Sequence, residues 1–322
     1  MKAVRITHTG APDVMKLVEV EDPTPGSGEV LIQVRAAGIN YIDVYYREGR
    51  YPADIPFTLG IEGAGTIQKL GRGVKDFRVG DAVAWCMYLG AYAEYAVIPE
   101  RHLVRIPDGI EFETAAGALL QGMTAHYLTR STYPLKSGET ALVHAAAGGV
   151  GLLLTQMASQ LGARVIATVS TKEKADLARE AGARDVILYS EQDFEAEVKR
   201  LTENRGVGVV YDSVGRTTFD KSLNCLRPRG MMVLVGASSG PVPAIDPLRL
   251  SLLGSLYLTR PSLAHYTLTR EELDWRSGEV YAAIQKGTLK LHIDHTYPLA
   301  EVVHAHEELE ARKTTGKGLL IP

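Results

Sequence analysis

Six short apolar runs, each followed by a stretch of helical character, fill the chain from Glu139 to about residue 260. Alternation of this kind is typical of a parallel sheet whose strands are joined by crossover helices. Six such strands predict a doubly wound Rossmann sheet of the dinucleotide-binding type, in an α/β protein. The expected strands are residues 140–144, 164–169, 185–189, 207–212, 231–235 and 255–258.

Glycines mark where the connecting helices should end. Helices are expected over residues 152–161 and 172–181, followed by Gly162 and Gly182. A residue without a Cβ adopts the left-handed conformation at no steric cost, which makes glycine the usual residue just after a helix.

The first third of the chain has a different texture, rich in glycine and proline, with short alternating segments that predict a β-rich domain. Helical segments follow around residues 114–130, one of them expected to end near Gly122. The last part, with a helix at 279–286 and a strand at 318–321, contains no further βα repeat. We therefore expect domain boundaries near residues 122 and 260. Strands in the first domain are expected at residues 30–35, 63–70, 81–85 and 92–98.

Composition excludes several classes of partner. The 35 basic and 38 acidic residues leave a formal charge of −3, so no overall field draws the chain to nucleic acid or to anionic lipid. No segment has the apolar length of a membrane span. The two cysteines, Cys86 and Cys225, lie far apart in sequence and do not form a disulfide framework. We expect a cytoplasmic protein with a small-molecule partner.

A glycine turn follows the first strand of the alternating region. Ala145–Ala146–Ala147–Gly148–Gly149–Val150–Gly151 stands between that strand and an apolar helix, although Ala145 replaces the first glycine of the fuller fingerprint. We expect Gly148 to adopt a backbone conformation closed to other residues, Gly149 and Val150 to offer amides to a diphosphate, and Gly151 to let the helix approach the sheet. The alternative is a turn that only packs tightly.

The second strand indicates which dinucleotide is bound. Sites selective for NAD place a carboxylate at this strand end, and none is present. Ser170 and Lys174 stand there instead, one helical turn apart, and suit a 2′-phosphate. The sequence therefore predicts NADPH, unless Lys172 and Lys174 are merely a solvated first turn of a helix.

The chain can hardly supply the three ligands of a catalytic zinc. Its two cysteines fall at neither plausible ligand position, and of its nine histidines only His304 and His306 are close in sequence. Their spacing points them in different directions, and we expect the histidines at the surface. Without a Lewis acid, the acceptor must take up hydride readily by itself, as a quinone or a conjugated enone does.

Motifs spread over the whole chain resemble the quinone oxidoreductase, or zeta-crystallin-like, branch of the zinc-free medium-chain dehydrogenase/reductase superfamily. Zinc-containing relatives carry cysteine at the place of Asn40 and histidine at that of Ile61. The resemblance implies a GroES-like catalytic domain built from both chain ends, a Rossmann domain between them, an active site in the cleft, and a homodimer. The resembling motifs are residues 37–43, 59–65, 80–83, 121–125, 144–151, 211–215 and 316–322.

The resemblance also assigns site residues. It implies that Asn40, Asp43 and Thr124 line the nicotinamide side, while Tyr45 and Tyr51, at the pocket rim, suit stacking on a flat acceptor. Further cofactor contacts are implied at Ser170, Lys174, Tyr189, Ser213, Val235 to Ser238, and Arg312.

Each of these assignments has a simpler alternative. Asn40 and Asp43 are equally suited to helix capping, and the tyrosines to amphipathic packing. Thr124 is equally suited to bonding a helix carbonyl.

The sequence therefore predicts a zinc-independent NADPH:quinone reductase that transfers hydride directly. Two alternatives remain open, a reductase of enones or enoyl thioesters and a non-catalytic NADPH-binding protein.

Overall fold

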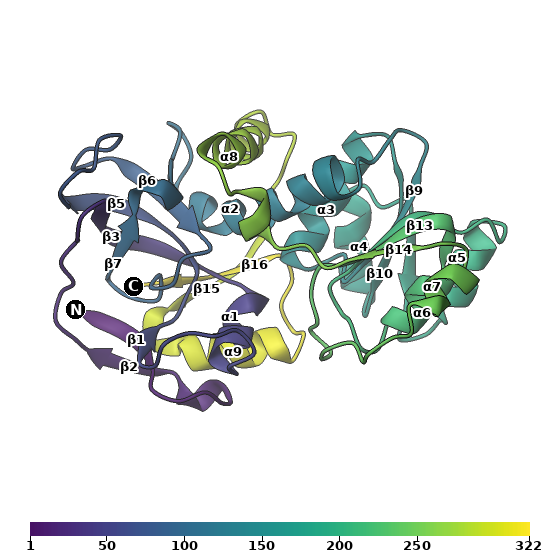
Figure 1. Cartoon of the computed structure of the whole chain (residues 1–322), viewed down its shortest axis with the longest axis horizontal. Coiled ribbons are helices and arrows are strands. Elements are labelled where there is room, and N and C mark those ends of the chain that lie inside the picture. Colours follow the sequence, from purple (N-terminus) through teal and green to yellow (C-terminus); the bar gives the residue numbers. More distant parts are fainter. The chain divides into compact units, whose positions relative to one another are not determined.

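The computed structural model describes all 322 residues and divides into two compact units. The first combines Met1–Met123 with Thr267–Pro322, and the second is Thr124–Tyr266. Both chain ends therefore belong to the first unit, as the N and C labels in Figure 1 show. The boundary falls inside one helix, α2 (Phe112–Tyr127).

The second unit is built on one six-stranded sheet whose strands all run parallel, in the order β11–β10–β9–β12–β13–β14. This is the order 3-2-1-4-5-6 of a Rossmann fold, so the predicted fold class is confirmed. The strands are β9 (Thr140–His144), β10 (Arg164–Val169), β11 (Asp185–Leu188), β12 (Val207–Asp212), β13 (Leu226–Leu234) and β14 (Tyr257–Thr259). The helices are α3 (Gly149–Gln160), α4 (Lys172–Glu180), α5 (Phe194–Leu201), α6 (Phe219–Asn224) and α7 (Leu248–Leu252).

The predicted ends of α3 and α4, each marked by a following glycine, are confirmed. Gly162 has φ +79° and Gly182 has φ +102°, and each follows the helix that it was expected to end. Gly122 behaves differently, because α2 continues through it to Tyr127. A Cβ at Gly122 would lie 2.7 Å from Val280, so this glycine permits close helix packing and the predicted helix end there is wrong.

The first unit contains a seven-stranded sheet of order β15–β16–β3–β5–β6–β8, with β7 paired to β3, and a three-stranded sheet of order β2–β1–β4. The strands are β1 (Lys2–Ile6), β2 (Lys16–Glu19), β3 (Glu29–Ile39), β4 (Phe57–Thr58), β5 (Glu62–Leu70), β6 (Ala82–Cys86), β7 (Tyr95–Pro99), β8 (Leu103–Arg105), β15 (Ile293–Pro298) and β16 (Lys317–Ile321). Beside α2, its helices are α1 (Tyr41–Arg47), α8 (Arg270–Gln285) and α9 (Val302–Glu310). Helix α8 begins nine residues before the predicted start at residue 279.

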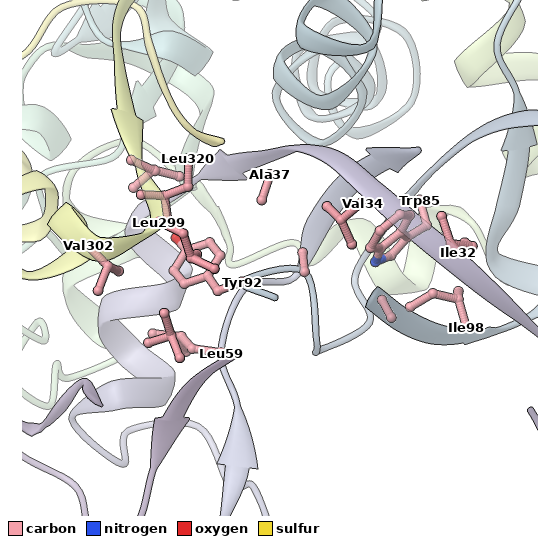
Figure 2. Packing of buried hydrophobic residues seen from close by; sticks show 14 of the residues in the cluster. Ile32, Val34, Ala37, Leu59, Trp85, Tyr92, Ile98, Leu299, Val302 and Leu320 are labelled. Carbon is pink, nitrogen blue, oxygen red and sulfur yellow. The ribbon is translucent and has the colours of Figure 1, made fainter. Parts of the chain in front are cut away.

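The core of the first unit joins its early and late segments. Figure 2 shows Tyr92 among Leu59, Leu299 and Leu320, side chains from both ends of the chain that belong to one buried cluster. Strand β16 pairs antiparallel with β3, which anchors the C-terminal segment at the end of the strand that leads into α1. None of the helices is both long enough and apolar enough to cross a bilayer.

Three histidines expected at the surface lie in the interior. His126, His144 and His306 are at most 2% exposed, so the expectation was wrong for them. His306 Nδ1 lies 3.2 Å from a nitrogen of Arg47, and its Nε2 lies 3.4 Å from the Tyr92 hydroxyl. Arg47 only donates, so Nδ1 is the acceptor and the imidazole is neutral. Burial, with the nearby Arg47 charge, lowers the pKa of His306 to about 3.

The buried neutral His306 should make stability depend on pH. In the unfolded chain this histidine is protonated below about pH 6.5, whereas in the folded protein it stays neutral down to about pH 3. Its contribution to the free energy of unfolding is therefore lost as pH falls from 6.5 to 3. Asp43 acts oppositely, because burial raises its pKa to about 7, which is why the wild type must be compared with a variant. In urea titrations, the stability gap between wild type and His306→Asn should narrow on acidification by up to about 1.36 kcal/mol per pH unit.

His304→Asn is the matched control, since His304 lies on the same helix with 57% of its side chain exposed. A gap between wild type and His306→Asn that stays constant from pH 7 to pH 4 would contradict the burial of a neutral imidazole.

Candidate functional site

The turn between β9 and α3 has the shape of a diphosphate cradle, with one change from expectation. Ala145, and not Gly148, takes the left-handed conformation, with φ +49°, while Gly148 has φ −79°, which any residue adopts. The prediction for Gly148 was therefore wrong. A Cβ on Gly151 would lie 2.3 Å from the carbonyl oxygen of Ala145, so only glycine lets α3 approach the turn this closely.

The first turn of α3 presents unpaired backbone donors. Gly148 is the N-cap residue of this 12-residue helix and provides no side-chain cap, which leaves the amides of Gly149, Val150 and Gly151 available. Amides at a helix N-terminus, together with the helix dipole, favour a bound anion. The residues present therefore fit a dinucleotide diphosphate.

At the carboxyl end of β10 the structure brings Ser170 and Tyr189 together. The Tyr189 amide donates to the Val169 carbonyl at 3.1 Å, and the Ser190 hydroxyl donates to the Ser170 carbonyl at 2.9 Å. Lys174 lies in the first turn of α4, where its amide donates to the N-cap Thr171. Tyr189 is 40% exposed. Hydroxyls and one ammonium, with no carboxylate at the strand end, fit a 2′-phosphate.

The ends of β12 and β13 lie on the other side of β9 from β10. Asp212 Oδ1 accepts from the amides of Val214 at 2.8 Å and Gly215 at 2.9 Å, which shapes the turn that carries Ser213. The Ser238 amide donates to the Ser213 carbonyl at 3.2 Å, and the Val235 amide to the Asp212 carbonyl at 2.7 Å.

Arg312, the remaining predicted cofactor residue, belongs to the first unit, where it follows α9 with φ +59°. Its role in cofactor binding stays a prediction.

Asn40 is held by a fully buried ion pair in the first unit. Lys317 Nζ lies 2.6 Å from Glu62 Oε2 and 2.8 Å from Asn40 Oδ1, and both charged side chains are 0% exposed. Asn40 Nδ2 donates to the same Glu62 oxygen at 2.8 Å and to the Gly38 carbonyl at 3.2 Å. Because Lys317 only donates and Glu62 accepts, the Asn40 amide has a single orientation.

Asp43 supports the same segment from below. Its carboxylate accepts from the Asn40 backbone amide at 2.8 Å, the Tyr92 hydroxyl at 2.9 Å and the Ile61 backbone amide at 3.2 Å. The side chain is 0% exposed, and burial raises the pKa of Asp43 to about 7 against the opposing effect of these donors. The bond to the Asn40 amide is the capping contact of α1, so the capping role proposed for Asp43 is present.

Tyr45 and Tyr51 meet in an aromatic cluster around α1. Their ring centroids lie 5.6 Å apart, and Tyr41 contacts Tyr45 at 5.5 Å. The Arg50 guanidinium lies 5.3 Å from the Tyr45 ring. Tyr45 is only 6% exposed, which makes it mainly a packing residue, whereas Tyr51 is partly exposed.

Thr124 lies in the part of α2 that belongs to the second unit and is 6% exposed. Its hydroxyl forms none of the helix-carbonyl bonds that Thr129 forms with Ala125 at 2.9 Å. The simpler alternative for Thr124 is therefore absent, and its hydroxyl is available to a ligand.

Several buried polar residues beside these sites were not identified from the sequence. Glu62 and Lys317 lie within motifs quoted for the family resemblance, and the only signal was a charge at an otherwise apolar strand position. His144 and Asp212 each end a buried strand, His144 directly before the glycine turn and Asp212 directly before Ser213. A polar residue at the last position of an apolar strand is the signal that could have found them.

No three histidine, cysteine or acidic side chains are placed so that they could hold a metal ion. The Asn40 side chain accepts from Lys317, and the Ile61 amide donates to Asp43.

Two family models match the chain, one within the first unit and one mostly within the second. A model of the alcohol dehydrogenase GroES-like domain matches residues 26–108, and one of the zinc-binding dehydrogenase family matches residues 149–277. A quinone oxidoreductase of Pseudomonas aeruginosa is 46% identical over 100% of this chain and 99% of its own length. A 2-haloacrylate reductase of a Burkholderia species is 41% identical over 99% and 98%, respectively.

Solved structures match over the full chain. The Escherichia coli quinone oxidoreductase complexed with NADPH has a TM-score of 0.98 at 44% identity, and both chains are covered completely. A mycobacterial protein complexed with NADPH has a TM-score of 0.97 at 50% identity, again with complete coverage of both. With this likeness in sequence, domain content and fold, the chain belongs to the quinone oxidoreductase branch of the medium-chain dehydrogenase/reductase superfamily.

Proposed function

We propose that this protein is an NADPH-dependent oxidoreductase that reduces quinones without a metal ion. The observation that carries the proposal is the pair of subsites at the carboxyl ends of β9 and β10, one fitted to a diphosphate and one to a 2′-phosphate. The NADPH complexes of two relatives with the same fold support the choice of cofactor. A 46% identical quinone oxidoreductase supports the choice of acceptor.

The residues divide the work of binding and orientation. The amides of Gly149 to Gly151 would hold the diphosphate, and Ser170, Lys174 and Tyr189 the 2′-phosphate. Bound NADPH supplies the hydride for a two-electron reduction. Asn40 and Thr124 would orient the nicotinamide side, with Asp43 acting only through Asn40. Ser213, Val235, Ser238 and Arg312 would complete the cofactor contacts.

A quinone that receives one hydride still needs one proton to become a hydroquinone. Water or a tyrosine hydroxyl would supply it, and Tyr51 is the more accessible of the two predicted pocket tyrosines. Orientation of two planar partners accounts for most of the acceleration, since well-oriented reactants gain roughly 7 to 11 kcal/mol.

The β10 subsite should set the cofactor preference. Lys174→Ala removes a charge-assisted contact worth about 1.5–3 kcal/mol, so the Michaelis constant for NADPH should rise roughly ten- to a hundredfold while that for NADH stays the same. Lys172→Ala, two residues earlier in α4 and exposed, is the matched control and should leave both constants unchanged. A wild-type Michaelis constant lower for NADH than for NADPH would refute the assignment.

The acceptor is tested by initial rates with ortho-quinones, para-quinones, enones and 2-haloacrylates under saturating NADPH. We expect quinones to be turned over most efficiently. The 2-haloacrylate reductase among the relatives makes a conjugated acid or enone the second candidate. Turnover of an enone or haloacrylate, with no quinone accepted, would replace our assignment by this second one.

We also propose a homodimer formed through β14. This strand is the edge of the six-stranded sheet, so its outer backbone groups have no strand partner. Three large apolar side chains stand exposed near it, Leu248 at 59%, Leu252 at 78% and Tyr257 at 58%. Separately, we propose a cytoplasmic location, because both cysteines are free and buried and a reducing compartment suits proteins without disulfides.

Sedimentation equilibrium should give twice the chain mass for the wild type and for the control Leu268→Glu, an equally exposed leucine in the first unit. The double variant Leu252→Glu/Tyr257→Glu should sediment as a monomer, because two carboxylates would be buried in the interface. A wild-type monomer would end this part of the proposal.

A further inference from the structure

Four buried side chains form a hydrogen-bonded chain across the carboxyl ends of three parallel strands. Thr168 of β10 lies 2.8 Å from His144 Nδ1, at the end of β9. His144 Nε2 lies 2.9 Å from the Ser222 hydroxyl of α6, and this hydroxyl lies 3.3 Å from Asp212 Oδ2 at the end of β12. All four residues are at most 2% exposed.

The direction of these bonds follows from the acceptor at one end. Asp212 accepts two backbone amides at one oxygen and the Thr218 hydroxyl at the other, at 2.7 Å, so Ser222 donates to it as well. Ser222 then accepts from the N–H at His144 Nε2, and His144 Nδ1 accepts from Thr168. Burial lowers the pKa of His144, which keeps the imidazole neutral as this pattern requires.

A serine, a histidine and an aspartate in contact suggest nucleophilic catalysis, but this arrangement does not provide it. In a catalytic triad the acid orients the histidine, whereas here Asp212 bonds Ser222. The Ser222 side chain is also 0% exposed, so no substrate carbonyl can reach it. The chain of bonds therefore needs another explanation.

Each strand-end member lies directly beside a segment to which we assign the cofactor. His144 precedes Ala145, the residue that turns the backbone toward α3. The Thr168 carbonyl accepts from the Ala146 amide at 3.2 Å, and Thr168 stands two residues before Ser170. Asp212 precedes Ser213 and holds its turn.

We infer that His144 is a positioning residue for the nucleotide, which fixes the three strand ends relative to one another through Thr168 and Ser222. The inference rests on the proposed function, since it concerns the same cofactor site. From β9, His144 bonds β10 through Nδ1 and α6 through Nε2, and Ser222 of α6 extends the chain of bonds to Asp212 at the end of β12. Its removal should disturb the diphosphate and 2′-phosphate subsites together.

The test is the dissociation constant of NADPH, measured by fluorescence titration of the full chain. His144→Phe keeps the edge contact with Phe194, at 4.8 Å, and loses both hydrogen bonds. Thr168→Val and Ser222→Ala each break one link. Each of the three variants should bind NADPH about five- to tenfold more weakly, the loss expected for one or more buried bonds. Turnover at saturating NADPH and the Michaelis constant for the acceptor should stay within twofold.

A double variant separates a positioning chain from ordinary packing. If the bonds act as one unit, Thr168→Val/Ser222→Ala should weaken binding no more than either single change, whereas independent effects would multiply. Thr202→Val is the matched control, because it removes a buried hydroxyl that bonds Val198 at 2.7 Å near the end of α5. It should lower the melting temperature without changing NADPH affinity.

Unchanged NADPH affinity in all three single variants, or multiplied losses of affinity in the double variant, would overturn the inference. In either case, NADPH binding by the wild type would leave the proposed function intact. A wild type that does not bind NADPH would overturn the proposed function and this inference with it. If His144→Phe does not fold, the two partner variants carry the same test.

Discussion

The close approach of α3 to the turn before it is the constraint on which the cofactor-binding unit depends. A Cβ on Gly151 would lie 2.3 Å from the Ala145 carbonyl oxygen, so any other residue would push the helix away from the sheet. This approach brings the free amides of the first helical turn to the carboxyl end of β9, at the centre of the sheet. An alanine in the left-handed conformation is tolerated there, which explains how the turn forms without the first glycine of the fingerprint.

In the first unit, a buried ion pair holds the segment around Asn40 in place. Lys317 and Glu62 are separated by 255 residues and join β16 to β5, with Asn40 between them. A Cβ on Gly38 would lie 2.4 Å from Glu62 and 2.7 Å from Lys317, so the strand leaves space for the pair. Removing one partner would leave the other charge buried and unpaired, which usually destabilises a protein far more than replacing both charged residues by apolar ones. Asn40 therefore has its orientation imposed by electrostatics.

Much of the second unit followed from the sequence, because parallel strands are buried on both faces and appear as continuous apolar runs. Gly162 and Gly182 also marked their helix ends correctly. The helix end predicted at Gly122 was wrong, because a glycine that ends a helix and a glycine that lets a neighbouring helix pack closely look alike in sequence. The partners of His306 and Lys317 could not be predicted, since they lie more than 200 residues away and come together only through the paired chain ends.

The carboxyl ends of the strands in the second unit form the NADPH site that we propose. The most direct measurement is a crystal structure of the protein with NADPH bound. We expect diphosphate oxygens within hydrogen-bonding distance of the amides of Gly149 to Gly151, and the 2′-phosphate on Ser170 and Lys174. A diphosphate bound away from the N-terminus of α3, or a 2′-phosphate directed into solvent without contact to Ser170 or Lys174, would contradict the account.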